Sequence, residues 1–215
     1  MSEYATISSR SIAEIEEKKS RFIAHLAHVE SEEEALSFLE EIRTEHRMAR
    51  HNVYAYILRG EGASERIRYS DDGEPQGTAG MPILDVLQKN GLTDVCCVVT
   101  RYFGGVLLGA NGLVRAYSHS TALAIEAAQI KIMMPCYPVS IQTDYALYGK
   151  IAYHLPQEDI LQLDTIFEDQ VELKLLVRDT LWDKLKQELI DLTSGQVEIV
   201  SGGLQYADFS KAKRL

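Results

Sequence analysis

The stretch from Ser70 to Tyr117 decides the fold, and it reads SDDGEPQGTAGMPILDVLQKNGLTDVCCVVTRYFGGVLLGANGLVRAY. It predicts an acidic, glycine-rich loop, a short helix, a strand over 95–102, a Gly-Gly turn and a long helix over 110–129. Both alternating faces of the 95–102 segment are apolar, which is typical of a strand in the centre of a sheet. We therefore expect the rest of this half of the chain to be arranged around that strand.

Composition restricts the class of protein. The 215 residues include 22 Lys and Arg against 32 Asp and Glu, a net charge of −10. A chain this acidic is not a general nucleic-acid coat, although a local basic face remains compatible with it. There is no basic-then-apolar signal segment and no apolar run of membrane-spanning length, so we expect a cytoplasmic protein without membrane contact.

The three cysteines predict neither a disulfide framework nor a metal site. Cys96 and Cys97 are neighbours in the predicted strand, so their side chains point to opposite faces of the sheet. Cys136 is alone in a connecting segment. We expect all three to be reduced, and the strand pair to be buried; no spacing indicates a metal or another cofactor.

Upstream of this stretch the pattern predicts two strands within residues 11–29, joined by a turn at Glu16 to Lys19. Ser31 with Glu34 forms a capping box that begins a helix. The buried stripe of this helix is expected to be Ala35, Leu36, Phe38, Leu39 and Ile42. A strand over Asn52–Leu58 follows, and then a polar loop over 59–69.

Downstream, residues 132–134 predict a short strand that closes a first domain over 1–135. Pro135 and Pro138 are expected to break regular structure and to begin a second domain over 136–215. That domain reads as strand, helix, a hairpin about 168–170, helix and strand, which is the ferredoxin-like βαββαβ order. The tail from Asp208 is expected to be loose. The fold class is thus α+β in two domains.

Two loops carry the polar groups that could act chemically. Gly104, Gly105, Gly109 and Asn111 precede or begin the 110–129 helix, whose N-terminus attracts anions; a purely structural tight turn is the alternative. The acidic loop holds Asp71, Asp72 and Glu74, which suit either a hard cation or acid–base work. Its alternative is a turn whose aspartates bond their own backbone, so the role of this loop stays open.

Basic and aromatic residues gather in the same region. Six arginines lie between Arg43 and Arg68, and Arg101, Arg115 and several tyrosines accompany them. Mixed cationic and aromatic groups are typical of single-stranded RNA sites, and a solvated helix face is the alternative. His46, His51 and His119 lack a nucleophile in suitable geometry, so no catalytic residue is assigned. The predicted nucleic-acid or anion-binding residues are Arg47, Arg50, Arg101, Tyr102, Phe103, Gly104, Gly105, Gly109, Asn111, Arg115 and His119.

The run GMPILDVLQKNGLTDVCCVVTRYFGGVLLG, with KKSRFIAH upstream and GLVRAY downstream, resembles the signature of the IMPACT family, in particular its bacterial two-domain branch. The resemblance implies a first domain with the fold seen in ribosomal proteins and in domain IV of elongation factor G. It implies a second, ferredoxin-like domain similar to domain V of that factor. Eukaryotic members restrain a starvation-responsive initiation-factor kinase by competing for its activating partner. They carry an extra N-terminal domain that has no counterpart in this sequence.

The sequence and the resemblance together predict a protein that binds RNA or the ribosome and regulates translation, with a protein partner in translational control as a further expectation. One alternative is an enzyme that acts on a phosphorylated metabolite or nucleotide, with Asp71 or Asp72 as its base. Another is a protein-interaction module that needs no RNA. No cofactor is implied by any of the three.

Overall fold

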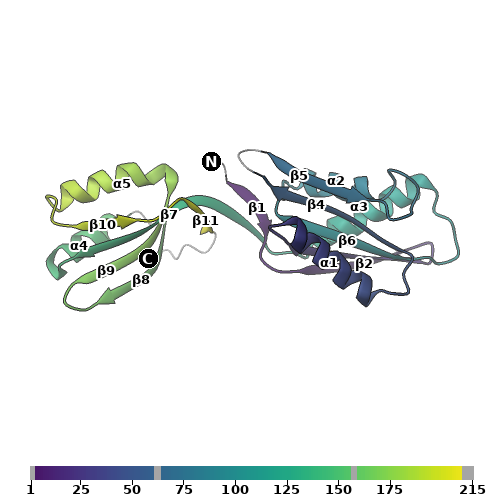
Figure 1. Cartoon of the computed structure of the whole chain (residues 1–215), viewed down its shortest axis with the longest axis horizontal. Helices are drawn as coiled ribbons and strands as arrows, with labels where there is room; N and C mark the ends of the chain where they lie inside the picture. The colour runs from purple at the N-terminus through teal and green to yellow at the C-terminus, as the bar shows by residue number, and fades with distance from the viewer. Residues whose placement is uncertain (1–2, 61–63, 156–158, 210–215) are drawn as a thin grey trace. The chain divides into compact units, whose positions relative to one another are not determined.

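The computed structural model describes residues 3–60, 64–155 and 159–209 (Figure 1). The chain forms two compact units, which we call the N-terminal unit, Tyr4–Lys131, and the C-terminal unit, which begins at Ile132. Each contains helices packed on a β-sheet, so the fold is α+β in two domains.

The sheet of the N-terminal unit has five antiparallel strands in the order β2-β3-β6-β4-β5. Their bounds are β2 Ser11–Glu17, β3 Ser20–His28, β6 Val95–Tyr102, β4 His51–Arg59 and β5 Glu65–Ser70. The short strand β1, Tyr4–Ile7, precedes them. The prediction that 95–102 is the central strand is confirmed, because β6 pairs with β3 on one side and β4 on the other.

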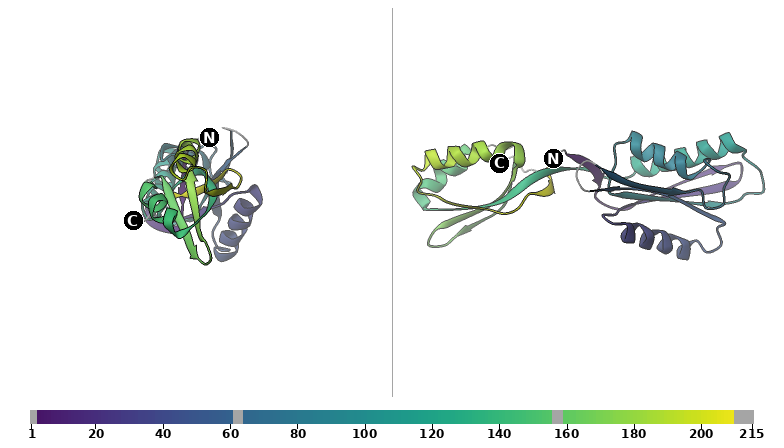
Figure 2. Two further views of the ribbon diagram at one scale, coloured as in Figure 1. Left: turned by 90° about the vertical axis from the view of Figure 1, so that its left-hand side faces the viewer. Right: turned by 45° about the horizontal axis from the view of Figure 1, so that its top comes forward.

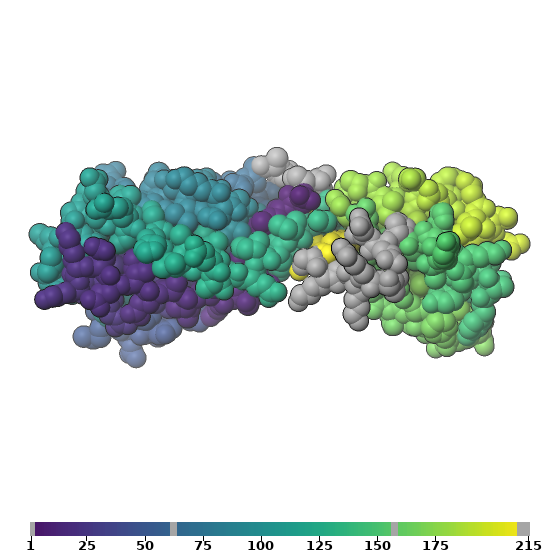
Figure 3. All heavy atoms as spheres, turned by 180° about the vertical axis from the view of Figure 1, so that it is seen from behind, coloured from purple at the N-terminus to yellow at the C-terminus, as the bar shows by residue number. Residues whose placement is uncertain are grey.

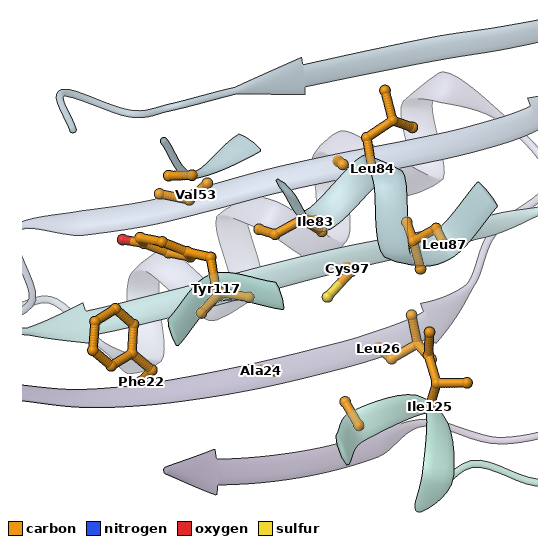
Figure 4. Close-up of a cluster of buried hydrophobic side chains, with 14 of the residues drawn as sticks. Phe22, Ala24, Leu26, Val53, Ile83, Leu84, Leu87, Cys97, Tyr117 and Ile125 are labelled. Atoms are coloured by element: carbon orange, nitrogen blue, oxygen red, sulfur yellow. The ribbon is translucent and has the colours of Figure 1, made fainter. Parts of the chain in front are cut away.

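Helices cover both faces of this sheet (Figure 2). α1, Glu32–Glu45, packs on one face through Phe38 and Leu39 against Tyr56 and Cys96. α2, Gly80–Lys89, and α3, Ala110–Glu126, pack on the other face. Figure 4 shows that second core, in which the labelled side chains of the strands meet those of the two helices. Because both faces are covered, β6 is apolar on both, as its sequence indicates.

Local sequence signals account for several boundaries. Ser31 accepts a hydrogen bond from the backbone N–H of Glu34 at 3.1 Å and so caps α1 as predicted. Lys18 and Lys19 form the β2–β3 turn with φ of 47° and 66°. Leu36 was expected in the buried stripe of α1, but it is 43% exposed. It lies one residue from Ala35, and adjacent helical residues point in different directions.

The predicted polar loop over 59–69 is wrong in its second half, which is strand β5. The sequence ERIRYS carries only one aliphatic residue, Ile67, and every residue of β5 is exposed or half-buried. β5 is an edge strand that pairs only with β4. Charged side chains are common on such edges because they discourage pairing with another chain, which hides the strand from pattern reading.

The C-terminal unit has the order βαββαβ followed by one short strand. Its elements are β7 Ile130–Thr143, α4 Tyr145–His154, β8 Ile160–Phe167, β9 Val171–Arg178, α5 Asp179–Leu192, β10 Glu198–Ser201 and β11 Gln205–Asp208. The antiparallel pairs give the order β8-β9-β7-β10, which is the ferredoxin-like arrangement. Trp182, Leu185 and Leu189 of α5 fill its core.

The prediction that Pro135 and Pro138 break regular structure is wrong, because strand β7 runs through both prolines. Pro138 lies opposite the gap between β10 and β11, and its carbonyl accepts from the N–H of Gly202 at 2.8 Å. Because the N and the C=O of a strand residue face the same side, the missing N–H of Pro138 faces this gap. A strand tolerates proline where no ladder bond is required.

The tail prediction is only partly open to comparison, because residues 210–215 lie outside the described residues. Asp208 itself belongs to β11, which pairs with β7, and Phe209 packs on Cys136 and Leu176. The described helices include none that is long and apolar enough to cross a membrane.

The buried thiols give a first prediction. Cys96, Cys97 and Cys136 have no exposed surface, and burial raises the pKa of Cys97 to about 12 and that of Cys136 to about 11. A thiol reagent at about pH 8 should therefore label the native protein far more slowly than the protein unfolded in urea, because it needs an accessible thiolate. Fast labelling of the native protein would contradict this arrangement.

Candidate nucleic-acid interface

Four loops meet at the end of the N-terminal sheet where β6 finishes. They are the 18–19 turn, the 46–50 segment after α1, the acidic loop 71–79 and the 103–109 loop. The strand registers bring them together, since Tyr102 lies opposite Arg21 and Arg101 lies opposite both Phe22 and His51. We define the rim as the exposed side chains of three of these segments, the 18–19 turn, the 46–50 segment and the 103–109 loop, and they are Lys18, Lys19, Arg47, Met48, Arg50, Phe103, Val106 and Leu107.

Gly104 holds the 103–109 loop against the β2–β3 turn. Its N–H donates to the Ser20 hydroxyl at 3.1 Å. A Cβ at this position would overlap the carbonyl carbon and oxygen of Lys19, which are backbone atoms and cannot rotate away. Only glycine permits this approach. The requirement for glycine at position 104 therefore comes from contact between two backbones.

The acidic loop bonds its own backbone. The Asp71 carboxylate accepts from the N–H groups of Gly77, Ala79 and Gly80 at 2.8, 3.1 and 2.8 Å, which satisfies the start of α2. Asp72 accepts from the N–H of Asn52 at 2.7 Å and contacts Arg43 at 3.3 Å. Asp71 therefore fits the structural alternative given above, a turn that bonds its own backbone, whereas Asp72 connects the loop to β4 and to α1. The described residues contain no cluster of three metal-ligating side chains.

Glu74 joins the loop to the interior. It is buried, and its Oε1 accepts from Nη1 of Arg101 at 2.6 Å and from the Tyr117 hydroxyl at 2.8 Å. Arg101 is only 6% exposed and lies over the rings of Phe22 and Phe103. The sequence suggested a surface phosphate contact for Arg101, whereas the structure places it in a buried ion pair. Burial and the Glu74 carboxylate also raise the pKa of Tyr117.

Tyr102 also has an internal partner. Its hydroxyl lies 3.0 Å from Nδ1 of His46, and Nε2 of His46 lies 3.1 Å from Nε2 of His25. His25 is buried in β3, and this burial, followed by the neighbouring His46, lowers its pKa. These side chains face α1, on the opposite side of the sheet from Arg101. Base stacking by Tyr102 would therefore require this network to open, and Phe103 is the exposed aromatic residue instead.

The arginines predicted as one patch are divided. Arg43 pairs with Glu40 and Asp72, and Arg59 pairs with Asp94. Arg66 and Arg68 lie on the edge strand β5, away from the rim. Tyr56 is buried and its hydroxyl donates to Glu32. Arg47 and Arg50 are exposed at the rim and have no ion pair among the described residues.

Two hollows flank the first turns of α3. One, of about 370 Å³, has Arg50, Arg101, Phe103 and Gly109 in its wall. The other, of about 650 Å³, is lined by Arg115 and His119 together with Lys18 of the β2–β3 turn. Figure 3 shows the purple N-terminal strands lying against the teal residues of α3. Of the remaining predicted residues, Gly105 and Asn111 line neither hollow.

Sequence reading missed the exposed apolar part of the rim. Met48 is 87% exposed and Leu107 is 82% exposed. The signal was present, since VLL between Gly105 and Gly109 is too apolar for an ordinary surface loop. Lys18 and Lys19 were seen only as turn residues, and their place beside Gly104 depends on a contact between distant parts of the chain.

Comparison with known proteins identifies the two halves. Residues 18–125 match the Impact N-terminal domain and residues 141–196 match a domain of unknown function. The IMPACT family member YvyE of Bacillus subtilis is 37% identical, over 95% of this chain and 94% of that protein. The protein IMPACT homolog of Dictyostelium discoideum is 41% identical, over 46% of this chain and 29% of that protein. A crystal structure of a hypothetical protein is 32% identical, covers 94% of this chain and 98% of its own, and superposes with a TM-score of 0.62.

The buried ion pair predicts a strong effect on stability. Arg101→Ala leaves the Glu74 carboxylate buried without its cation, which should lower the free energy of unfolding by about 3–5 kcal/mol. Arg115→Ala removes the same charge from an exposed position and should change it by about 0.5 kcal/mol or less. Urea denaturation of both variants makes the comparison. Equal losses would show that the Glu74–Arg101 pair is not a structural requirement.

His25 predicts a dependence of stability on pH. Its pKa in the folded protein is below the ordinary value of 6.5, so below that pH the unfolded chain takes up a proton that the folded chain does not. The free energy of unfolding should therefore fall between about pH 7 and about pH 5. His25→Gln should reduce this slope, and His119→Gln, at an exposed position on α3, is the matched control. Identical slopes in all three proteins would refute the assignment.

Proposed function

The chain belongs to the IMPACT family, and from that premise we propose that it acts in translational control by binding RNA or the ribosome through the rim. Membership of this family supports a role in translational control, because its eukaryotic members regulate translation. The chemistry of the rim supports the mode of binding. A protein partner bound in the course of that control is part of the same proposal.

The observation that carries the proposal is the unpaired charge of the rim. Lys18, Lys19, Arg47 and Arg50 have no ion pair among the described residues, although the whole chain is acidic. In the same unit Arg10 pairs with Glu41 and Arg21 pairs with Glu14. Arg66, Arg68 and Arg115 also have no ion pair among the described residues, so the rim is distinguished by having four such cations at one end of the sheet. Cations left free of carboxylates are available to phosphates, and the binding they give is sensitive to salt.

The exposed apolar side chains of the rim add a second interaction. Phe103 is 46% exposed and lies beside the cations, as does Leu107. Unpaired bases in RNA stack on such aromatic groups with little dependence on sequence. The combination favours single-stranded or looped RNA, including the loops of ribosomal RNA, over a regular duplex.

The C-terminal unit offers a less suitable surface. On the face of its sheet opposite the helices, the Ser140 hydroxyl donates to Glu172 at 2.7 Å, and Lys174 lies near the same carboxylate. The cation on this face is therefore partly neutralised by its neighbour. This supports assigning the phosphate contacts to the N-terminal unit.

The enzyme alternative is weakened by the acidic loop. Asp71 and Asp72, the bases it would require, already accept hydrogen bonds from backbone N–H groups. Use of either carboxylate as a base would therefore disturb the bonds that hold this loop in place. The protein-interaction alternative stays open, since Met48 and Leu107 would suit a protein partner equally well.

We expect the double variant Arg47→Ala with Arg50→Ala to lose association with ribosomes in sucrose gradients of cell lysate at low salt. In filter binding to a single-stranded RNA, the slope of log affinity against log salt should fall by roughly 0.7 for each phosphate contact removed. The matched control is Arg66→Ala with Arg68→Ala, which removes the same charge from the edge strand β5.

Both double variants must keep the thermal stability of the parent protein, which their exposed positions predict. If the wild-type protein stays at the top of every gradient, ribosome binding is refuted. If the two double variants are impaired equally, binding depends on total charge and the rim is not the site. If association survives RNase and high salt, a protein partner replaces RNA in the proposal.

A further inference from the structure

We propose that the hollow at the start of α3 binds one nucleotide, with its phosphate against the N-terminus of the helix and its base on Phe103. This rests on the proposed function and gives it a specific contact, since the nucleotide belongs either to an RNA strand or to a free mononucleotide. The shared chemistry is a phosphate monoester or diester joined to a planar ring.

The hollow has the size and composition for such a group. Its volume of about 370 Å³ falls in the range of small-ligand sites, roughly 300–1,000 Å³. Its lining includes the polar side chains of Arg50, His51, Glu74 and Arg101 and the apolar side chains of Phe103, Leu107 and Leu113. A ligand that carries both an anionic group and a planar apolar ring matches this lining.

The start of α3 is open to an anion. Gly109 is its N-cap, with φ of 74° and no side chain that could accept from the first N–H groups. Gly109 and Ala110 both line the hollow. The start of α2 differs, because Asp71 occupies its N–H groups. Unsatisfied N–H groups together with the helix dipole favour a phosphate at α3.

Arg101 supplies an independent observation. It lines the same hollow, it is more than nine-tenths buried, and its Nε has no hydrogen-bond partner. Among the described residues Nη1 donates to Glu74, whereas Nε has no acceptor. A buried donor without an acceptor is unfavourable, and most such groups in folded proteins are satisfied by protein, water or ligand. A phosphate between Arg101 and the helix N-terminus would provide acceptor oxygens.

The remaining charges favour a single phosphate. The negative charge of Glu74 is shared by Arg101 and the Tyr117 hydroxyl, so it opposes an incoming anion less than a free carboxylate would. Arg50 is exposed at the mouth and free of ion pairs among the described residues, so it can close over the ligand. Inorganic phosphate has no ring to cover the exposed side chain of Phe103. A nucleotide, which has both a phosphate and a base, is therefore the better match.

The test is a titration of the full chain, labelled with ¹⁵N, with adenosine 5′-monophosphate while amide signals are recorded by NMR. The amides of Gly109, Ala110 and Asn111 should shift and saturate. Adenosine, which lacks the phosphate, and inorganic phosphate, which lacks the ring, should each bind at least about tenfold more weakly. A 5′-phosphorylated trinucleotide distinguishes the two sources, since tighter binding than the mononucleotide indicates an RNA strand.

Variants locate the contact. Arg50→Ala should weaken binding of adenosine 5′-monophosphate by about tenfold or more, because it removes a charge-assisted hydrogen bond. Phe103→Ala should weaken it by a similar factor through lost stacking. Arg66→Ala is the matched control, since Arg66 is exposed on the edge strand β5 and lines neither hollow, and it should leave the affinity unchanged.

The inference is overturned if the mononucleotide shifts none of these amides, or if adenosine shifts them equally. It is also overturned if Arg66→Ala matches Arg50→Ala. These outcomes are separable from the fate of the proposed function. Ribosome association without mononucleotide binding retains the rim and rejects the hollow. Mononucleotide binding without ribosome association retains the hollow and rejects translational control through the rim.

Discussion

The carboxylate of Glu74 is the interaction on which the rest of the N-terminal unit depends. It is buried, and it holds the acidic loop, strand β6 through Arg101 and helix α3 through Tyr117 to a single point. Breaking a buried pair of this kind leaves a charge without compensation, so the three elements are fixed together. The positions of Phe103 and of the start of α3, and hence the shape of the hollow, follow from that point.

Much of this could be predicted from local pattern. The apolar strand β6, the capped start of α1 and the βαββαβ order depend on residues close in sequence, where period and capping chemistry determine the outcome. The role of Arg101 depends on Glu74, which is distant in sequence, and no local signal distinguishes a buried arginine from an exposed one. The separation of Arg50 from Arg66 likewise follows from strand register.

The net charge of the chain is informative about partners only when the positions of the charged residues are known. Some of its acidic residues pair with arginines: Glu41 on α1 with Arg10, Glu14 on β2 with Arg21 of β3, and Glu40 with Arg43 of the same helix. Lys18, Lys19, Arg47 and Arg50, which have no ion pair among the described residues, lie together at one end of the sheet. A net charge therefore says little about partners until the pairs inside the protein have been subtracted.

The central position of β6 also bears on how the chain folds during synthesis. β3 and β4 do not pair with one another; each pairs with β6, which leaves the ribosome well after both. The sheet cannot close until residue Tyr102 has emerged, and until then the inner edges of both earlier strands lack their partner. Folding that waits for such distant contacts is slow, so a nascent chain of this protein will spend a long interval with those edges open.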